Sequence, residues 1–361
     1  VASYSEYHSK LTTQLTSKTA PDVFYVGDDN IATLVVNDVL EPIDNCLSKE
    51  EATIALDDFN QEIYQIAQKD GVTYALPNDV NPDAFWYSKK ALEAAGITED
   101  PAELADNDEW TFDKFFEMTE KMKEADIVGA AFWNYWATWQ TILSSNGTPA
   151  YSEDGTFIGD DASAVAALQR WADHFQDGSL AVADVMPAGS DADTLLVTDK
   201  LGFMVQGRYT VGTIEGAGRD ISEFDVVRWP TASGAEEPVA VAASFLAINK
   251  DAKDKDAACN FFQMFLSAEG QTIRLQDDGN ALPSIAGIDN IVTDAGKPAN
   301  VAALIEMRDH GFSDSAVEAA VPGLSSDISE KIMLPLFQGK IDAADALSQV
   351  AEMLKEQGAT E

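Results

Sequence analysis

The amino-acid sequence predicts an α/β protein of two or three domains with largely parallel sheets. Its 361 residues exceed the usual size of a single domain. Apolar residues make up 45% of the chain and charged residues 24%, a balance typical of globular proteins with substantial cores. Short β-type runs alternate with amphipathic helical segments, and this alternation is typical of α/β layers.

The first half of the chain opens with a polar helical segment and then contains several β-type runs, most of them closed by a turn, a proline or a helix signal. A polar, proline-bearing link at 78–83 joins two of these runs. Thr111 is a suitable N-cap for a helix whose apolar face carries Phe115, Met118 and Met122. The expected strands are 23–26, 71–77, 85–87 and 127–132.

The second half of the chain contains longer helical patterns. A helix over 162–177 has one apolar face and ends at Gly178, a typical C-terminal cap. Another helix is expected over 256–267, and the C-terminal third is helical throughout. The expected strands are 201–205, 224–227 and the long apolar run 239–248.

The charge of the chain restricts its partners. Lys and Arg number 23 against 62 Asp and Glu, which gives a net charge of −39. Such a surface repels phosphate backbones and anionic lipid headgroups, so we expect no nucleic-acid partner and a monomeric protein. The longest mainly apolar run, 239–248, has ten residues, well short of the roughly twenty that cross a bilayer.

Cys46 and Cys259 are the two cysteines of the chain, and they lie far apart in the sequence. Neither has the spacing of a metal or redox motif. A disulfide between them stays open at this point, but we expect two free thiols. No cofactor motif is found, because 216–221 lacks the third glycine of a dinucleotide-binding loop.

An aromatic cluster at 131–139 places Trp133, Trp136 and Trp139 within seven residues. One interpretation is a core helix, since Trp136, Trp139 and Leu143 have helical spacing. The other is an aromatic wall on which a sugar ring stacks, because Trp and Tyr combine a large apolar face with a polar edge.

Eight short motifs occur in an order and spacing that is known from one protein family. They are 19–24 (TAPDVF), 39–42 (VLEP), 71–77 (GVTYALP), 87–89 (YSK), 110–115 (WTFDKF), 207–209 (GRY), 267–271 (SAEGQ) and 282–284 (LPS). Together they resemble the extracellular solute-binding proteins that deliver sugars to ABC importers, the wider family of the maltose-binding protein. The resemblance covers nearly the whole chain.

The chain departs from this family at its start. Family members usually begin with a signal or lipoprotein leader, followed by a strand, a helix and a second strand of the first lobe. This sequence opens at Val1 in what resembles a later part of the pattern. We expect that a leader has been removed and that the protein is extracellular, either a membrane-anchored lipoprotein or periplasmic.

The resemblance implies a two-lobe, periplasmic-binding-protein-like α/β fold with a ligand cleft between the lobes and hinge crossings. Lobe 1 would comprise 1–80 with 245–312, and lobe 2 would comprise 81–244 with 313–361. Crossings are expected near 77–83, near 241–245 and at about 305–315. Hinge closure around the cleft would then enclose the ligand.

Candidate ligand residues follow from the resemblance and from the chemistry of sugars, whose C–H faces stack on rings and whose hydroxyls bind polar side chains. In lobe 2, Trp136 resembles the family's stacking position and Tyr209 a position where the family commonly has a stacking Trp. Arg208 is expected either to bind sugar hydroxyls or to form a surface salt bridge. Trp229 is expected in the cleft, with the core as the alternative, and Trp139 is expected in the core. The remaining lobe 2 candidates are Trp133 and Asn134.

Lobe 1 and the crossings supply further candidates. Asp29 and Asn30 follow the strand 23–26, with a solvated turn as the alternative reading. Asp79 and Asn81 lie in the first crossing, where a purely structural hinge role is equally open. Ser244 lies in the second crossing at a position where the family often has glycine, and Asn280 is the weakest candidate.

The leading hypothesis is a non-catalytic carbohydrate-binding subunit that closes around a mono- or oligosaccharide and docks on the permease subunits of an ABC importer. One alternative keeps the fold and changes the ligand to a polyamine, a peptide or a metal ion, which would suit an acidic protein. The other is a carbohydrate-active enzyme. The sequence 323–327 lacks the second glycine of a nucleophile elbow, and the three histidines are scattered among polar helical residues.

Overall fold

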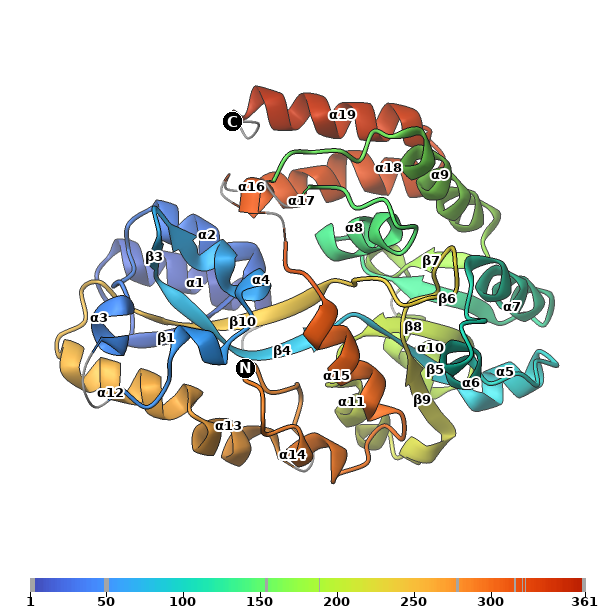
Figure 1. Ribbon diagram of the computed structural model, residues 1–361. Helices are drawn as coiled ribbons and strands as arrows, with labels where there is room; N and C mark the ends of the chain where they lie inside the picture. Colours follow the sequence, from blue (N-terminus) through green and yellow to red (C-terminus); the bar gives the residue numbers. More distant parts are fainter. Residues whose placement is uncertain are drawn as a thin grey trace.

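The computed structural model describes residues 4–48, 52–152, 155–187, 189–276, 279–314, 316–319, 321 and 323–358. These residues form two α/β lobes, each built around its own sheet, and two long strands run from one lobe toward the other (Figure 1). Within the described residues, no helix combines the length and the apolar character that crossing a membrane requires.

The first lobe is built on a three-stranded sheet of order β1-β10-β4, with both pairings antiparallel. Its strands are β1 (Val23–Gly27), β4 (Ala75–Pro82) and β10 (Val241–Ile248). The helices α2 (Asp28–Val36) and α12 (Lys255–Leu266) pack against β1 and β10. Smaller elements complete the lobe: α1 (Tyr4–Thr16), α3 (Asp44–Leu47), α4 (Gln61–Tyr64), β2 (Gln68–Lys69), β3 (Val72–Thr73), α13 (Ala268–Leu275) and α14 (Asn290–Thr293).

The second lobe is built on a five-stranded sheet of order β7-β6-β8-β5-β9. Its strands are β5 (Ala84–Ser88), β6 (Val128–Phe132), β7 (Leu180–Val182), β8 (Leu201–Gln206) and β9 (Phe224–Val227). Its helices are α5 (Lys89–Ala94), α6 (Pro101–Asp106), α7 (Phe112–Glu124), α8 (Trp136–Ser144), α9 (Ala162–Asp177), α10 (Ala192–Val197) and α11 (Thr210–Gly216).

The expectation of largely parallel sheets is wrong. Among the described strands, only β6 forms parallel pairs, with β7 and β8, whereas β5 runs antiparallel to β8 and β9. The reason is the path of the chain: β4 leaves the first lobe and leads directly into β5, and β10 returns. β4 and β10 cross in opposite directions and therefore pair antiparallel. Because β4 leads into β5, the first residue of β5 pairs with the last residue of β8, and these two strands are antiparallel as well.

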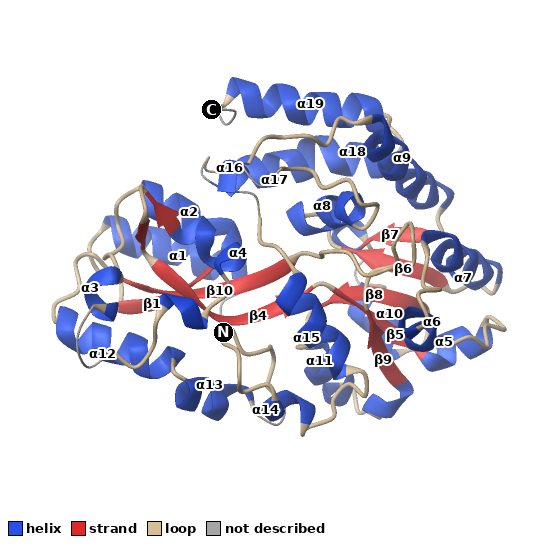
Figure 2. Ribbon diagram, viewed as in Figure 1, coloured by secondary structure: helices blue, strands red, loops and turns tan. Residues whose placement is uncertain are grey.

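The crossing strands lie where the sequence placed two of the three hinge segments. β4 and β10 pair with each other along 75–82 and 241–247 and run between the lobes (Figure 2). Beside them, α15 (Val301–His310) is followed by a third crossing, in which Phe312 forms backbone hydrogen bonds of 3.0 and 2.8 Å with Val239 and Val241.

The C-terminal helices lie mostly over the second lobe. Contacts with α8 and α9 hold α17 (Leu324–Ile328), α18 (Leu334–Phe337) and α19 (Ala343–Glu356) on that lobe. The π-helical turn Ser329–Met333 packs against these three helices. In contrast, α16 (Ala316–Ala319) packs against α2 of the first lobe. The residue limits of the two lobes stay a prediction, because this segment touches both.

Cys46 and Cys259 form a disulfide, so the expectation of two free thiols is wrong. Cys46 lies in α3 and Cys259 in α12, and these helices pack side by side with a Cα–Cα distance of 5.5 Å between the two cysteines. The separation of 213 residues hid this contact from sequence reasoning.

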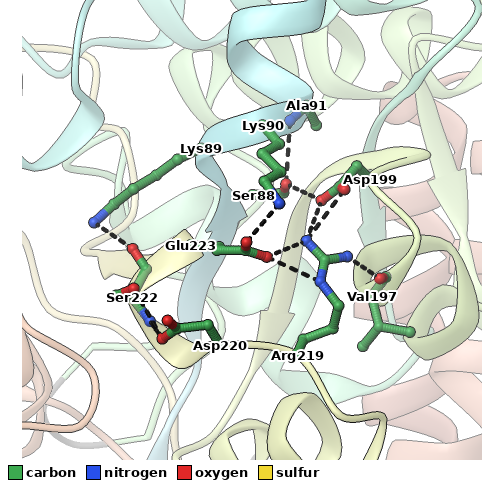
Figure 3. A network of polar contacts seen from close by, with 10 residues as sticks. All are labelled: Ser88, Lys89, Lys90, Ala91, Val197, Asp199, Arg219, Asp220, Ser222 and Glu223. Carbon is green, nitrogen blue, oxygen red and sulfur yellow. Dashed lines mark hydrogen bonds and ion pairs between the residues drawn. The ribbon is translucent and has the colours of Figure 1, made fainter.

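An ion network fastens one edge of the second lobe (Figure 3). Ser88 caps the N-terminus of α5 and donates a hydrogen bond of 2.7 Å to Asp199. The Arg219 guanidinium bridges Asp199 at 3.1 Å and Glu223 at 2.5 Å, and Lys90 pairs with Glu223 at 2.5 Å. These contacts hold the turns after α10 and α11 against the end of β5.

Candidate functional site

A cavity of about 850 Å³ lies between the lobes, with walls from both lobes and from the crossing strands. The carboxyl ends of β6 and β8 open onto it, since parallel neighbouring strands end at the same edge of a sheet. We call it the cleft. It is lined by Tyr25, Asp28, Asp79, Asn81, Asp83, Trp133, Tyr135, Asp184, Gly207, Tyr209, Ala242, Ala243, Ser244, Arg274, Leu275 and Asn280.

Aromatic rings from both lobes line the cleft. Tyr25 comes from β1 of the first lobe, and Tyr209 follows β8 of the second; each is 42% exposed although both are large aromatic residues. Trp133 follows β6 and is half-buried. The Tyr25 ring is fixed by an edge contact to Phe265 at 5.7 Å. Such exposed rings are suited to stack on an apolar ligand face.

Three carboxyl groups, two of them buried and one half-buried, line the cleft, and burial raises the pKa of each. The pKa of Asp28 is raised to about 8 by burial and then by the charge of Asp29, although Asp28 accepts a 3.1 Å hydrogen bond from the Ala243 N–H. Burial raises the pKa of Asp83 to about 7, against the hydrogen bond that Tyr135 donates to it. These groups are therefore partly protonated near neutral pH and can act as donors as well as acceptors.

Asp79 is the third of these carboxyl groups and is the one with a basic partner. Burial raises its pKa to about 6, and Arg274 at 3.5 Å opposes that shift. Arg274 also lies 4.1 Å from the centre of the Phe265 ring and donates a 2.7 Å hydrogen bond to the Asn78 carbonyl. The basic side chain that lines the cleft is thus already engaged with the protein.

A second, smaller cavity of about 280 Å³ adjoins the cleft, since Asp28 and Tyr135 line both. Trp136 lines this cavity with only 2% of its surface exposed, and its ring packs on Phe312. Asn134 is held there by a 2.9 Å hydrogen bond from its amide to the Ser329 carbonyl. We call this cavity the acidic compartment because five carboxylic acids line it: Asp28, Asp29, Asp314, Glu318 and Glu330.

The structure separates the candidates from the sequence into three groups. One group lines the cleft: Asp79, Asn81, Trp133, Tyr209, Ser244 and the weakest candidate, Asn280. A second group lines the acidic compartment: Asp29, Asn134 and Trp136. The remaining candidates line neither of these cavities: Asn30, Arg208 and Trp229.

Arg208 and Trp229 are corrections, because both are fully buried. The Arg208 guanidinium donates hydrogen bonds to the carbonyls of Gly279 and Ala281 and so fixes the end of β8 to the first lobe. Trp229 lies beneath the cleft, where its ring packs 4.9 Å from Phe85 and its indole N–H donates to the Asp83 carbonyl at 2.7 Å. It belongs to the aromatic core.

Several cleft residues were missed by sequence reasoning. Asp28 and Tyr135 adjoin candidates that the sequence predicts, since Asp28 precedes Asp29 and Tyr135 lies between Asn134 and Trp136, and Asp83 ends the expected first crossing. The sequence patterns that indicated the neighbouring segments could therefore have indicated these three residues as well. Tyr25 and Arg274 carried no such signal.

A dedicated metal site is not seen in the described part of the chain, where no group of three or more His, Cys, Asp or Glu side chains is arranged to hold an ion. The carboxyl groups of the cleft are instead spread over its walls, among rings and amides. This arrangement is suited to a ligand with several hydroxyl groups.

Comparison with known proteins gives consistent results. Residues 1–272 match the family model described as bacterial extracellular solute-binding protein. A binding protein of Brucella abortus strain 2308 is 24% identical over 359 residues, which cover 95% of this chain and 80% of that protein.

Solved structures with the same fold include an ABC substrate-binding protein from Listeria monocytogenes in complex with cycloalternan. Its TM-score is 0.83 at 18% identity, with 100% of this chain and 90% of that chain covered. A receptor of Streptomyces glaucescens, studied unliganded and in complex with acarbose, gives a TM-score of 0.80 at 16% identity, and the match covers 99% of this chain and 88% of that chain. The two lobes, the crossing strands and the match of the family model over most of the chain lead to one conclusion: this protein belongs to the bacterial extracellular solute-binding protein family.

Proposed function

We propose that this protein is the substrate-binding subunit of an ABC importer and that it holds a mono- or oligosaccharide in the cleft. The observation that carries the proposal is the convergence of exposed rings and hydroxyl-binding groups from both lobes on one cavity. Tyr25 and Tyr209 supply rings, while Asn81, Ser244 and Asp83 supply donors and acceptors. A cavity of about 850 Å³ also has the size of a typical small-molecule site.

The neighbours in fold support a sugar as the ligand class. Besides the proteins bound to cycloalternan and acarbose, a solute-binding protein from Thermotoga lettingae is bound to tagatose, and a sugar transporter protein from Arthrobacter chlorophenolicus to laminaribiose. The fold family does not fix the ligand, so the chemistry of the cleft carries the argument.

A substrate-binding subunit must deliver its sugar to a membrane transporter, so the proposed function also implies partners and a cellular location. We propose that the closed, sugar-bound form docks on the permease subunits of the importer outside the cell membrane, with the protein either anchored as a lipoprotein or free in the periplasm. Ligand contacts to both lobes would stabilise the closed form by mass action. The protein would release the sugar unchanged.

A thermal-shift screen tests the proposal. Mono- and oligosaccharides are compared with peptides, polyamines and divalent metal ions, since a ligand that binds only the folded state raises Tm. We expect a large shift with one class of sugar and no new product after prolonged incubation. A shift with a polyamine, a peptide or a metal ion alone would overturn the sugar assignment, and product formation would overturn the non-catalytic role.

Small-angle scattering tests the closure. Saturating sugar is expected to reduce the radius of gyration, because the lobes rotate toward each other about β4 and β10. A tightly bound sugar that leaves the scattering curve unchanged would contradict closure.

A further inference from the structure

The acidic compartment has an unusual balance of charge. Five carboxylic acids line it, and none of its described lining residues is Lys, Arg or His. Asp28 comes from the start of α2 in the first lobe, whereas Glu318 comes from α16 after the third crossing. The compartment therefore brings carboxyl groups of separate elements together at the junction of the lobes.

Asp28 and Glu318 are buried in this compartment rather than solvated. Glu318 is 0% exposed and accepts hydrogen bonds from the Tyr151 hydroxyl and, at 3.2 Å, from the Gln140 amide. Burial raises the pKa of Glu318 to about 7 and the pKa of Asp28 to about 8. Buried carboxyl groups without a cation nearby are costly when ionised, and a bound cation removes that cost.

Among the described residues, three neutral polar atoms of the same walls also lack hydrogen-bond partners: the Trp136 indole nitrogen, the Ser329 hydroxyl oxygen and the Asn134 amide oxygen. All three atoms are buried, and their residues line the compartment. Buried polar groups in native proteins are normally satisfied, so these atoms point to a polar ligand.

We infer that the acidic compartment receives an ammonium group, so that the protein selects an amino sugar over neutral and acidic sugars. This inference rests on the proposed function and specifies its substrate class. An ammonium has three donors and no acceptor, which matches carboxyl acceptors such as Asp28 and Glu318. The indole N–H of Trp136 requires an acceptor, and a sugar hydroxyl oxygen can provide it.

The cleft itself supports the same selection. Arg274 is its basic lining residue, and Asp79 and the Asn78 carbonyl already engage it. An anionic sugar would therefore meet buried carboxyl groups without a free basic partner. Like charges in such a site disfavour binding strongly.

Matched sugars test the inference. The sugars are glucose, galactose and mannose and their β-1,4- and α-1,4-linked dimers. Each is titrated in four chemical forms: the neutral sugar, the free 2-amino sugar, the N-acetylated amino sugar and the uronic acid. We expect the free amine to bind at least about tenfold tighter than the neutral and N-acetylated forms, and the uronic acid to bind weakest. Equal or tighter binding of a neutral sugar overturns the inference and leaves the proposed function intact.

Variants locate the effect. Glu318→Gln keeps an oxygen for the Tyr151 and Gln140 hydrogen bonds, and it should remove most of the preference for the amine while neutral sugars bind as before. Glu62→Gln is the control, because Glu62 lines a neighbouring cavity, together with Gln140, but not the acidic compartment, and it should change nothing. If Glu318→Gln does not fold, Asp28→Asn replaces it; because Asp28 also lines the cleft, the readout is then the ratio of the affinity for the amine to the affinity for the neutral sugar, which should fall.

The failure of the inference can be told apart from the failure of the proposed function. If no sugar of any form binds, the proposed function falls and the inference falls with it. If putrescine or spermidine binds and no sugar does, the compartment binds ammonium groups but the amino-sugar assignment is overturned. A preference for the amine that survives Glu318→Gln and Asp28→Asn would place the recognition elsewhere and contradict the inference.

Discussion

Tyr209 shows how one position after a strand can serve a ligand. The backbone turns from β8 into α11 at Gly207–Tyr209, which leaves the Tyr209 ring 42% exposed at the cleft while the neighbouring Arg208 is fully buried. An exposed ring beside polar groups is expected to stack on a sugar face.

We expect Tyr209→Ala to weaken sugar binding by about 1–2 kcal/mol, roughly five- to thirtyfold, because the stacking surface is lost. Calorimetric titration with the sugar identified by thermal shift measures this change. Tyr209→Phe keeps the ring and should bind nearly as tightly as the wild type. Unchanged affinity in Tyr209→Ala would remove this ring from the site.

Trp136 has a different character, because it is 2% exposed and packs on Phe312 while lining the acidic compartment. The sequence alone predicts that Trp136→Ala abolishes binding with the fold intact. The burial adds a cost in stability of about 3–5 kcal/mol, typical of truncating a buried Trp. We therefore expect a lower Tm together with lost binding.

Trp139→Ala is the control for this prediction. Trp139 is fully buried on the same helix but lines neither the cleft nor the acidic compartment, so its truncation should lower Tm and spare the affinity. Both variants are compared by thermal melts and by titration at a temperature at which they are folded. Wild-type affinity in Trp136→Ala would show that Trp136 does not contact the ligand.

At the scale of single residues, the sequence predicted the segments that line the two cavities more reliably than the individual lining side chains. The sequence predicts Asp29 as a ligand residue, yet the adjacent Asp28 is buried at the cleft and accepts a hydrogen bond from the Ala243 N–H. Which of two consecutive side chains faces the ligand depends on where β1 ends and α2 begins, at Gly27 and Asp28. No composition or spacing rule fixes that point.

At the scale of elements, strongly periodic helices were predictable. The predicted helix over 162–177 corresponds to α9 (Ala162–Asp177), and Thr111 caps α7 as expected, with its hydroxyl accepting from the Lys114 N–H. Strand directions were not predictable, because they depend on β4 and β10 crossing between the lobes in opposite senses. The burial of Trp229 depends on the same crossing, since Asp83 anchors its indole.

The disulfide also belongs to this scale. It links α3 to α12 across a sequence separation of 213. We expect that reduction lowers Tm by removing a cross-link that is typically worth about 2–4 kcal/mol. Melts with and without dithiothreitol measure this effect. The double variant Cys46→Ser/Cys259→Ser should have the Tm of the reduced wild type, and dithiothreitol should not change that Tm. A reductant-insensitive wild type would contradict the prediction.

At the scale of the whole molecule, buried carboxyl groups link stability to pH. The pKa values of Asp28, Asp79, Asp83 and Glu318 are raised to between about 6 and 8, mainly by burial. The folded protein therefore holds protons that the unfolded chain releases between about pH 4 and these values. Unfolding then releases protons, and stability falls as pH rises through that interval.

We expect Tm to be higher at pH 5 than at pH 8, with a difference in unfolding free energy of several kcal/mol at most. The net charge of −39 acts in the same direction, because self-repulsion grows as carboxyl groups ionise. Melts at intervals between pH 5 and 8 measure the slope, and Asp83→Asn should flatten it. A Tm that rises with pH over this range would contradict the burial of these groups.

The central claim is that one ligand contacts both lobes in the cleft, and hydrogen exchange tests it most directly. With the sugar found by thermal shift at saturation, we expect slower amide exchange at 25–28 of the first lobe, at 133–136 and 207–209 of the second, and at 241–245 of the crossing strand. Protection confined to one lobe, or protection that leaves these segments unchanged, would contradict binding between the lobes.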